Sequence, residues 1–216
     1  MTSWPTYSLD YIRRRYDRLA GVYPVFDWIF WLPRDARTRA VARLGLGAGE
    51  RALEVGCGTG RCFGPLLDAL GPRGHLYGVD ASEGMLSCAR RTCEQHDWRN
   101  VTLLCRDAAD FALPEPVDGV LFSLSYGVMP DPRSALRCAW AHLRPGRRLV
   151  ILSAHSPTRG PGRWLRPFGV WLSKATVLGD PDQRAWDDLA EVSDRVELQK
   201  MPDGMYYICC GTKNLD

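Results

Sequence analysis

The middle of the chain alternates short apolar runs with longer amphipathic stretches. Five of the apolar runs predict strands, over residues 51–55, 75–79, 101–105, 117–122 and 147–152. The amphipathic stretches between them predict helices over 61–70, 82–96 and 131–143. Ser82 and Asp131 stand at N-cap positions, and Pro132 follows in the first helical position. Strands and helices that alternate at these lengths predict a parallel sheet covered on both faces.

Both ends of the chain depart from this alternation. Residues 9–44 predict two or three short helices rich in aromatic side chains, and a helix is expected near 183–190. The strand-like segments 195–200 and 205–210 are joined by Pro202, Asp203 and Gly204, and an Asp-Gly pair is typical of a hairpin turn. We therefore expect the sheet to end in an antiparallel pair.

The length of 216 residues fits one domain with a substantial core. No internal repeat or long linker divides it. We expect four parts within this domain: a helical lid over 1–45, a core over 46–155, a lid insertion over 156–180, and a C-terminal helix and hairpin over 181–216.

Composition excludes several classes of protein. The chain is 45% hydrophobic and 25% charged, as in ordinary globular proteins, and its net charge of +3 gives no indication of nucleic-acid binding. Its eight cysteines include no C-x-x-C pair, so we expect reduced thiols and no metal site. The start of the chain lacks the features of a signal peptide, and no run of about 18 apolar residues occurs. These observations favour a cytoplasmic protein.

A glycine-rich turn follows the first predicted strand. Gly56, Gly58 and Gly60 allow close approach of the backbone to a ligand, and the helix that follows offers unpaired N–H groups. A tight turn without a ligand explains these glycines equally well when they are taken alone. Arg61 stands where the dinucleotide-binding pattern G-x-G-x-x-G needs glycine or alanine, which argues against a dinucleotide.

Two aspartates follow the next two strands. Asp80 ends the second strand, where a carboxylate can accept hydrogen bonds from both hydroxyls of a ribose. Its alternative role is to cap the helix that begins after Ser82. Asp107 follows the third strand and can accept a hydrogen bond from the exocyclic amine of an adenine, unless it is simply a solvated loop residue. Together with the glycines, these residues predict a site for an adenosine-bearing ligand at the carboxyl edge of the sheet.

These segments resemble the motifs of class I S-adenosylmethionine-dependent methyltransferases. Leu53–Gly60 is similar to their motif I, acidic-x-G-x-G-x-G, with Glu54 as the acid. Asp80 matches their motif II acid, and Asp107 with Ala108 matches their adenine-side motif. Residues 117–123 resemble the fourth-strand motif, and residues 143–149 resemble the turn L-x-P-G-G-x-L.

The second glycine of that turn is replaced here by Arg147, a departure that we expect to be harmless if φ at this residue is negative. The resemblance covers about residues 7–155. It implies S-adenosyl-L-methionine as cofactor, with S-adenosyl-L-homocysteine as product, and a Rossmann-like seven-stranded α/β sheet of order 3-2-1-4-5-7-6 with strand 7 antiparallel. It also implies that the cofactor contacts Tyr16, Tyr23, Glu54, Gly56, Cys57, Gly58, Gly60, Asp80, Ala81, Met85, Asp107, Ala108 and Ser123.

The N-terminal segment resembles one branch of the family more closely. Tyr16, Asp17, Ala20 and Tyr23 are similar to the YD-x-x-A-x-x-YD pattern of the ubiquinone and menaquinone C-methyltransferases and of phospholipid N-methyltransferases. The resemblance implies that Tyr23, and less directly Tyr16, approaches the carboxylate of the cofactor. Pro24 replaces the second aspartate of the pattern.

Transfer of a methyl group from a sulfonium is favourable, so the protein mainly needs to align the nucleophile with the methyl group and to exclude water. A general base is optional. His155, which follows the fifth strand, is the candidate base, and an ordinary surface histidine is the alternative. Tyr126, after the fourth strand, would orient the acceptor or form a wall of the pocket.

We expect the acceptor pocket to be completed by two aromatic stretches, 28–32 and 164–172. They suit a small hydrophobic or aromatic acceptor such as a quinone. The second stretch has basic neighbours, so peripheral contact with the inner membrane is an alternative to ordinary packing: Arg159, Arg163, Arg166 and Lys174. The competing functions are a phospholipid-amine N-methyltransferase and a cofactor-binding protein without transfer activity. A nucleic-acid partner is not expected, and the pattern does not predict the oligomeric state.

Overall fold

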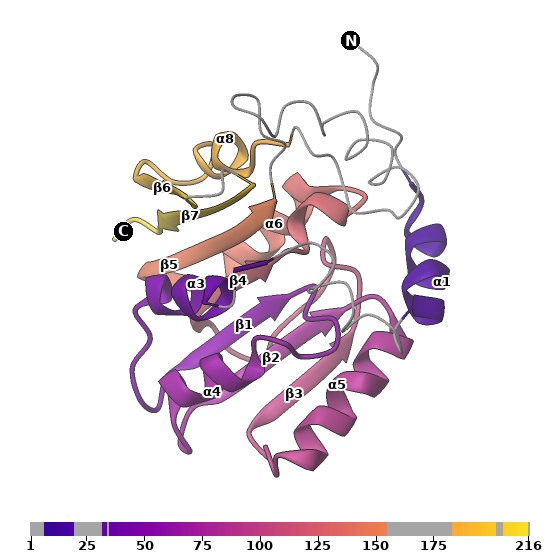
Figure 1. Ribbon diagram of the computed structural model, residues 1–216. Helices are drawn as coiled ribbons and strands as arrows, with labels where there is room; N and C mark the ends of the chain where they lie inside the picture. Colours follow the sequence, from indigo (N-terminus) through magenta and orange to yellow (C-terminus); the bar gives the residue numbers. More distant parts are fainter. Residues whose placement is uncertain (1–6, 20–31, 34, 155–182, 202–204, 216) are drawn as a thin grey trace.

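The structure is a computed structural model that describes residues 7–19, 32–33, 35–154, 183–201 and 205–215. Its centre is a seven-stranded sheet of order β3-β2-β1-β4-β5-β7-β6 (Figure 1). Strands β1 to β5 run parallel, whereas β7 is antiparallel to both of its neighbours. The predicted fold class, strand order and antiparallel strand 7 are confirmed. The strands are β1 (Arg51–Val55), β2 (His75–Asp80), β3 (Val101–Cys105), β4 (Val117–Ser123), β5 (Leu143–Ala154), β6 (Val196–Lys200) and β7 (Tyr206–Thr212).

Helices cover both faces of this sheet and form two separate core clusters. Helices α3, α4 and α5 pack on one face, whereas α6, α8 and the short 3-10 helix η1 pack on the other. Helix α1 lies outside these layers, beside α5 (Figure 1). The helices are α1 (Leu9–Leu19), α3 (Ala36–Leu44), α4 (Phe63–Leu70), α5 (Glu83–Gln95), η1 (Tyr126–Val128), α6 (Pro132–His142) and α8 (Ala185–Leu189).

The strands alternate their side chains between the two clusters. In β1, Ala52 packs with the α3–α4 side, while Leu53 and Val55 pack with the α6–α8 side. Because successive side chains of a strand point to opposite faces, Glu54 shares the face of Ala52. This acidic residue is therefore placed at the carboxyl end of a central strand, on the face that α3 and α4 cover.

The two predicted helix caps are confirmed. The Ser82 hydroxyl accepts a hydrogen bond from the Met85 N–H at 3.1 Å, and the Asp131 carboxylate accepts one from the Ser134 N–H at 3.0 Å. Each cap satisfies one of the N–H groups that the first helical turn leaves unpaired. The start of each helix is thereby fixed at the edge of the sheet where β2 and β4 end.

Strand β5 is longer than predicted. It begins at Leu143, which pairs with Val117, and the pairing then shifts so that Arg148 pairs with Gly119. The expected turn at residues 144–146 is a bulge within the strand, and its Gly146 has a φ of +76°. Among the described non-glycine residues only Asp97 and Leu124 have a positive φ, so Arg147 meets the condition under which loss of the family glycine is harmless.

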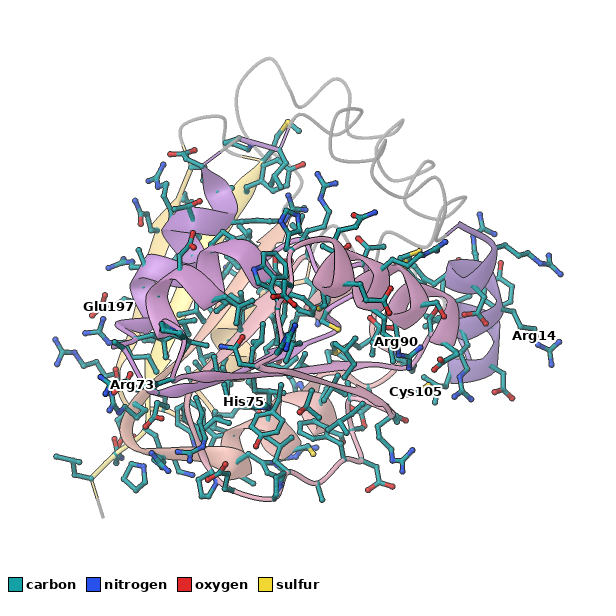
Figure 2. All side chains as sticks on the ribbon, turned by 90° about the horizontal axis from the view of Figure 1, so that it is seen from below. Arg14, Arg73, His75, Arg90, Cys105 and Glu197 are labelled. Atoms are coloured by element: carbon teal, nitrogen blue, oxygen red, sulfur yellow. The ribbon has the colours of Figure 1, made fainter. Side chains whose placement is uncertain are left out.

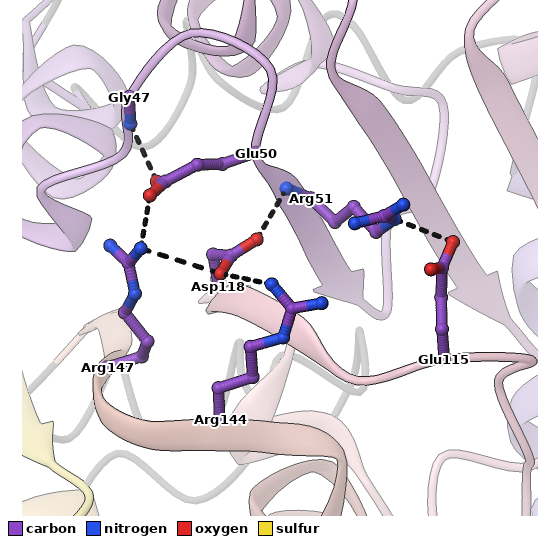
Figure 3. Close-up of polar contacts among 7 residues, drawn as sticks. All are labelled: Gly47, Glu50, Arg51, Glu115, Asp118, Arg144 and Arg147. Carbon is purple, nitrogen blue, oxygen red and sulfur yellow. Dashed lines mark hydrogen bonds and ion pairs between the residues drawn. The ribbon is translucent and has the colours of Figure 1, made fainter.

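Arg147 instead joins a cluster of charges at the amino ends of β1, β4 and β5 (Figure 3). Asp118, which is 2% exposed, accepts hydrogen bonds from the Arg51 N–H at 2.9 Å and from Arg144 Nη1 at 2.8 Å. Arg147 pairs with Glu50 and lies 3.6 Å from Asp118. A buried carboxylate needs such partners, because burial without them costs several kcal/mol. The cluster fixes the ends of three strands at the edge opposite to the glycine turn.

We predict that Asp118→Ala lowers the free energy of unfolding by about 2 kcal/mol, because it removes charge-assisted hydrogen bonds and leaves the Arg51 N–H without its acceptor. Urea unfolding measures this change. Asp118→Asn, which keeps an acceptor but no charge, should lose less. An unchanged denaturation midpoint for Asp118→Ala would show that the cluster does not stabilise the sheet.

Candidate functional site

A cleft of roughly 880 Å³, part of it open to solvent, lies at the carboxyl ends of the parallel strands. In open α/β sheets this edge is where ligands bind, because loops from neighbouring strands meet there. The cleft is bounded by the turns after β1, β2, β3 and β4 and by residues of α1 and α3. Segments far apart in the sequence therefore form a single site.

The glycine turn after β1 takes a conformation that other residues disfavour. Gly56, Gly58 and Gly60 have φ values of +69°, +56° and +81°. At Gly56 space is also restricted, because a Cβ atom would lie 2.4 Å from the Cβ of Ser125. The Ser125 hydroxyl donates to the Val55 carbonyl at 2.6 Å, which ties the loop after β4 to the end of β1. A Cβ atom added at Gly58 would meet no atom of the described residues within 4 Å, so the space on that side of the turn is open.

Asp80 joins the glycine turn to the start of α5. Its Oδ2 accepts a hydrogen bond from the Gly58 N–H at 2.8 Å, and its Oδ1 accepts one from the Ser82 N–H at 2.9 Å. Burial raises the pKa of the Asp80 carboxyl above its ordinary value, and these N–H donors oppose that shift. Each carboxylate oxygen has two lone pairs, so both oxygens can accept a further donor from a ligand.

The turn after β3 carries the adenine-side candidates. Asp107 is partly buried, and its Oδ1 accepts a hydrogen bond from the Ala109 N–H at 3.0 Å. The backbone of Asp107 also forms an isolated bridge with Asp110, which closes the turn. Met85, in the first turn of α5, is 2% exposed and lines the same cleft as Asp107 and Ala108. The cleft thus combines a carboxylate with apolar walls on this side.

Glu54 is the most unusual charge in the cleft. Its side chain is 2% exposed, and its Oε2 has no hydrogen-bond partner among the described residues. Burial raises the pKa of this carboxyl from 4.5 to about 8, and a hydrogen bond to Cys62 and the charge of Arg37 only partly oppose the shift. An unpartnered buried acceptor costs free energy unless a ligand supplies a donor. The Oε2 of Glu54 is therefore open to a further hydrogen-bond donor.

Most of the cofactor-binding residues expected from the sequence come together in this cleft. Gly60 does not line it and acts within the turn, where its N–H donates to the Cys57 carbonyl at 3.0 Å. Tyr23 and the candidate base His155 lie outside the described residues, as does the whole of the expected lid insertion over 156–180. The residues that line the cleft as expected are Tyr16, Glu54, Gly56, Cys57, Gly58, Asp80, Ala81, Met85, Asp107, Ala108 and Ser123.

Tyr126 does not lie where the sequence placed it. Its side chain is fully buried in the α6–α8 cluster, and its hydroxyl donates to Asp188 at 3.1 Å. Burial and the nearby Asp188 raise the pKa of this hydroxyl far above its ordinary value. The expectation of a catalytic Tyr126 needs correction: η1 turns this side chain into the core, away from the cleft.

Several cleft residues were not expected from the sequence. Leu9, Ile12 and Tyr16 are spaced three and four positions apart on α1. This spacing places the three side chains on one face of the helix, and it was the signal in the sequence that could have indicated their shared position. Arg37 lies near the start of α3, and nothing in its local sequence distinguishes it from the other arginines. Leu124 has a φ of +56°, a strained conformation that no local sequence pattern reveals. The loop after it adds Val128, Met129 and Pro130.

Parts of the chain are similar to known proteins. Residues 52–146 match the family model described as a methyltransferase domain. The chain is 28% identical over 148 residues to a demethylmenaquinone methyltransferase of Geobacillus sp. (strain WCH70), which covers 68% of this chain and 61% of that protein. It is 29% identical over 143 residues to an aklanonic acid methyltransferase of Streptomyces sp. (strain C5), covering 66% and 64%. The chain thus spans less than two thirds of the length of either relative.

Among solved structures, a chain of the complex between the Haloferax volcanii Trm112 methyltransferase activator and a methyltransferase superposes with a TM-score of 0.73. It is 16% identical and covers 93% of this chain and 98% of that chain. The fold and cleft define a Rossmann-like α/β protein with a cleft at the carboxyl edge of its sheet. Within this fold, residues 52–146 are similar to methyltransferase domains, and the fold is the Rossmann-like α/β fold of class I methyltransferases.

The raised pKa of Glu54 predicts a pH dependence of stability. Between pH 4.5 and about 8 the folded protein holds a proton on Glu54 that the unfolded chain releases. The contribution of this group to the free energy of unfolding therefore falls as pH rises through that window, by at most about 1.4 kcal/mol per pH unit. Glu54→Gln cannot ionise, so it should gain stability relative to the wild type as pH rises.

Urea unfolding of both proteins at about pH 5, 6.5 and 8 measures this difference. All other titrating groups are common to the two proteins, so the difference isolates position 54. A difference that stays constant with pH would show that Glu54 is ionised throughout.

Proposed function

We propose that this protein transfers a methyl group from S-adenosyl-L-methionine to a small hydrophobic or aromatic acceptor. The observation that carries the proposal is the arrangement of Glu54, Asp80 and Asp107 around one cleft, each at the end of a different parallel strand. Together these carboxylates match the donors of an amino acid, a ribose and an adenine. The family match is the second support.

The residues of the cleft fit this cofactor chemically. Glu54 offers an unpartnered acceptor to the ammonium of the methionine portion, and Arg37 offers a cation to its carboxylate. Asp80 would bind the ribose hydroxyls, and Asp107 would bind the adenine amine. Gly58 leaves open space beside the turn, so the ligand can approach the backbone closely. Tyr16 lines the same cleft, and Tyr23 is kept as a candidate contact to the carboxylate.

The cofactor supplies an activated methyl group when it is bound, and the protein then has to place the acceptor and exclude water. Apolar side chains of α1 and of the segment after β4 line the cleft and are suited to excluding water from it. These residues are Leu9, Ile12, Leu124, Val128, Met129 and Pro130. These side chains neither donate nor accept hydrogen bonds, so they favour an apolar acceptor. We propose His155 as the residue that removes a proton from the acceptor where its chemistry requires this.

The relatives support the choice of acceptor. Both are named for the molecule that they methylate, demethylmenaquinone in one case and aklanonic acid in the other. No helix in the described part of the chain is long and apolar enough to cross a membrane. We propose that the segments 1–45 and 156–180 serve as lids that complete the pocket around the acceptor.

We predict that the protein binds S-adenosylhomocysteine and that Asp80→Ala weakens binding tenfold or more, since about 1.4 kcal/mol of lost hydrogen bonding corresponds to a factor of about ten. Isothermal calorimetry measures both affinities. Asp110→Ala is the matched control, because Asp110 is an exposed aspartate of the adenine-side turn whose side chain is outside the cleft. Equal affinities for wild type and Asp80→Ala would refute the ribose assignment.

The acceptor is tested with methyl-labelled cofactor and three separate additions: a demethylated quinone, a polyhydroxylated aromatic acid, and vesicles of phosphatidylethanolamine. We expect label in one of the first two. Label in the vesicle lipid alone would instead establish the phospholipid N-methyltransferase. Cofactor binding without label in any acceptor would support a cofactor-binding protein without transfer activity.

With an acceptor in hand, His155→Ala should reduce turnover about 100-fold or more while leaving the affinity for S-adenosylhomocysteine intact, because a general base contributes to the chemical step and not to cofactor binding. His96→Ala is the control, since His96 lies at the far end of α5 and stacks on Trp98. An unchanged rate would make His155 an ordinary loop residue.

A further inference from the structure

Helix α1 is anchored to the turn between β2 and α5. Asp17 Oδ1 accepts a hydrogen bond from the Ser82 hydroxyl at 2.6 Å and another from the Gly84 N–H at 3.0 Å. The Gly84 N–H belongs to the first turn of α5, where N–H groups have no partner within the helix. Asp17 thus places a negative charge from α1 at the positive end of α5.

A second anchor reaches the same turn. Arg13, one helical turn before Asp17, donates from its Nε to the Ala81 carbonyl at 2.7 Å. Its Nη2 lies 3.8 Å from the Cys105 sulfur, at the end of β3. Both anchors therefore end beside Asp80, the proposed ribose ligand. The Ser82 N–H binds Asp80 while its hydroxyl binds Asp17, so Ser82 links the two acids.

The contact is close enough to involve the backbone of α1. A Cβ atom added at Gly84 would lie 2.9 Å from Asp17 Cα and 3.0 Å from Asp17 Oδ1. Gly84 lies within a helix and does not have a positive φ, so its conformation does not call for glycine. The close approach of α1 is what requires glycine at this position. The absence of a side chain at this position is explained by the docking of α1.

We propose that Asp17 and Arg13 are positioning residues that hold α1 closed over the cofactor, and that this docking sets how firmly the cofactor is retained. The inference rests on the proposed function. With α1 docked, Leu9, Ile12 and Tyr16 form one wall of the cleft. If binding requires the docked state, the apparent affinity falls in proportion to the fraction of molecules in which α1 is docked.

The first test uses trypsin, because α1 carries arginines at positions 13, 14, 15 and 18. Cleavage within a helix requires local opening. We expect S-adenosylhomocysteine to slow cleavage of wild-type α1. In Asp17→Ala we expect fast cleavage, little protection by the ligand, and affinity weakened about fivefold, the effect of losing a helix cap. Asp10→Asn, an exposed aspartate of the same helix, should behave as wild type.

The second test blocks docking by steric means. Gly84→Ala places a methyl group against α1, yet alanine is the better helix former, so α5 is not weakened. We expect faster cleavage of α1 and weaker ligand binding, with thermal unfolding followed by circular dichroism showing a folded core. Gly64→Ala is the control, because Gly64 is the second residue of α4 as Gly84 is of α5. Among the described residues, a Cβ atom at position 64 would meet only Trp98, at 3.8 Å.

Arg13→Gln should repeat the effect in a milder form, and Arg14→Gln should not. Each removes one trypsin site, and Arg14 points outward from α1 (Figure 2). Wild-type affinity and wild-type cleavage of α1 in both Asp17→Ala and Gly84→Ala would overturn the proposal. If the wild type itself does not bind S-adenosylhomocysteine, the proposed function fails, while cleavage rates without ligand still report whether these residues hold α1.

Discussion

The site depends on the two hydrogen bonds that Asp80 accepts at the end of β2. One comes from the glycine turn after β1 and the other from the start of α5, so a single carboxylate fixes two neighbouring loops. A partly buried acid is stable there because N–H donors reach both of its oxygens. The Ser82 hydroxyl extends the same network to Asp17 of α1. The position of the N-terminal helix and the shape of the ligand site are therefore set by connected contacts.

The buried acidic residues at the two opposite edges of the sheet differ in their partners. At the amino ends, the buried Asp118 is paired with Arg144 and Arg147, which neutralise its charge, and accepts a hydrogen bond from the Arg51 N–H. At the carboxyl ends, Glu54 is buried, and its Oε2 has no partner in the part of the chain that the structure describes, an arrangement that costs stability. The two carboxyl groups thus differ in environment, and an incompletely partnered polar group is more often found at sites that bind ligands than in structural ion pairs.

Much of the fold could be predicted from the sequence, because local patterns define it. The apolar run at 51–55 and the alternating helices indicated the parallel sheet, and the predicted caps at Ser82 and Asp131 follow from side-chain chemistry close in sequence. The predicted turn at 144–146 became a bulge, because pairing with β4 continues on both sides of it. Tyr126 was misplaced because the direction of its side chain depends on Asp188, 62 residues away.

The sequence alone determined the alternation of strands and helices, the glycine turn and the acids at the ends of β1, β2 and β3, because each depends on spacing or on the conformational freedom of glycine. The order of the strands was implied by the resemblance to a known family, and the structure confirmed it. Only the tertiary structure showed that Arg37 and the apolar face of α1 enter the same cleft, that Glu54 is buried without a full set of partners, and that Gly84 is small to admit α1. Those properties arise where distant segments meet, and burial there, rather than residue type, decides what a side chain can do.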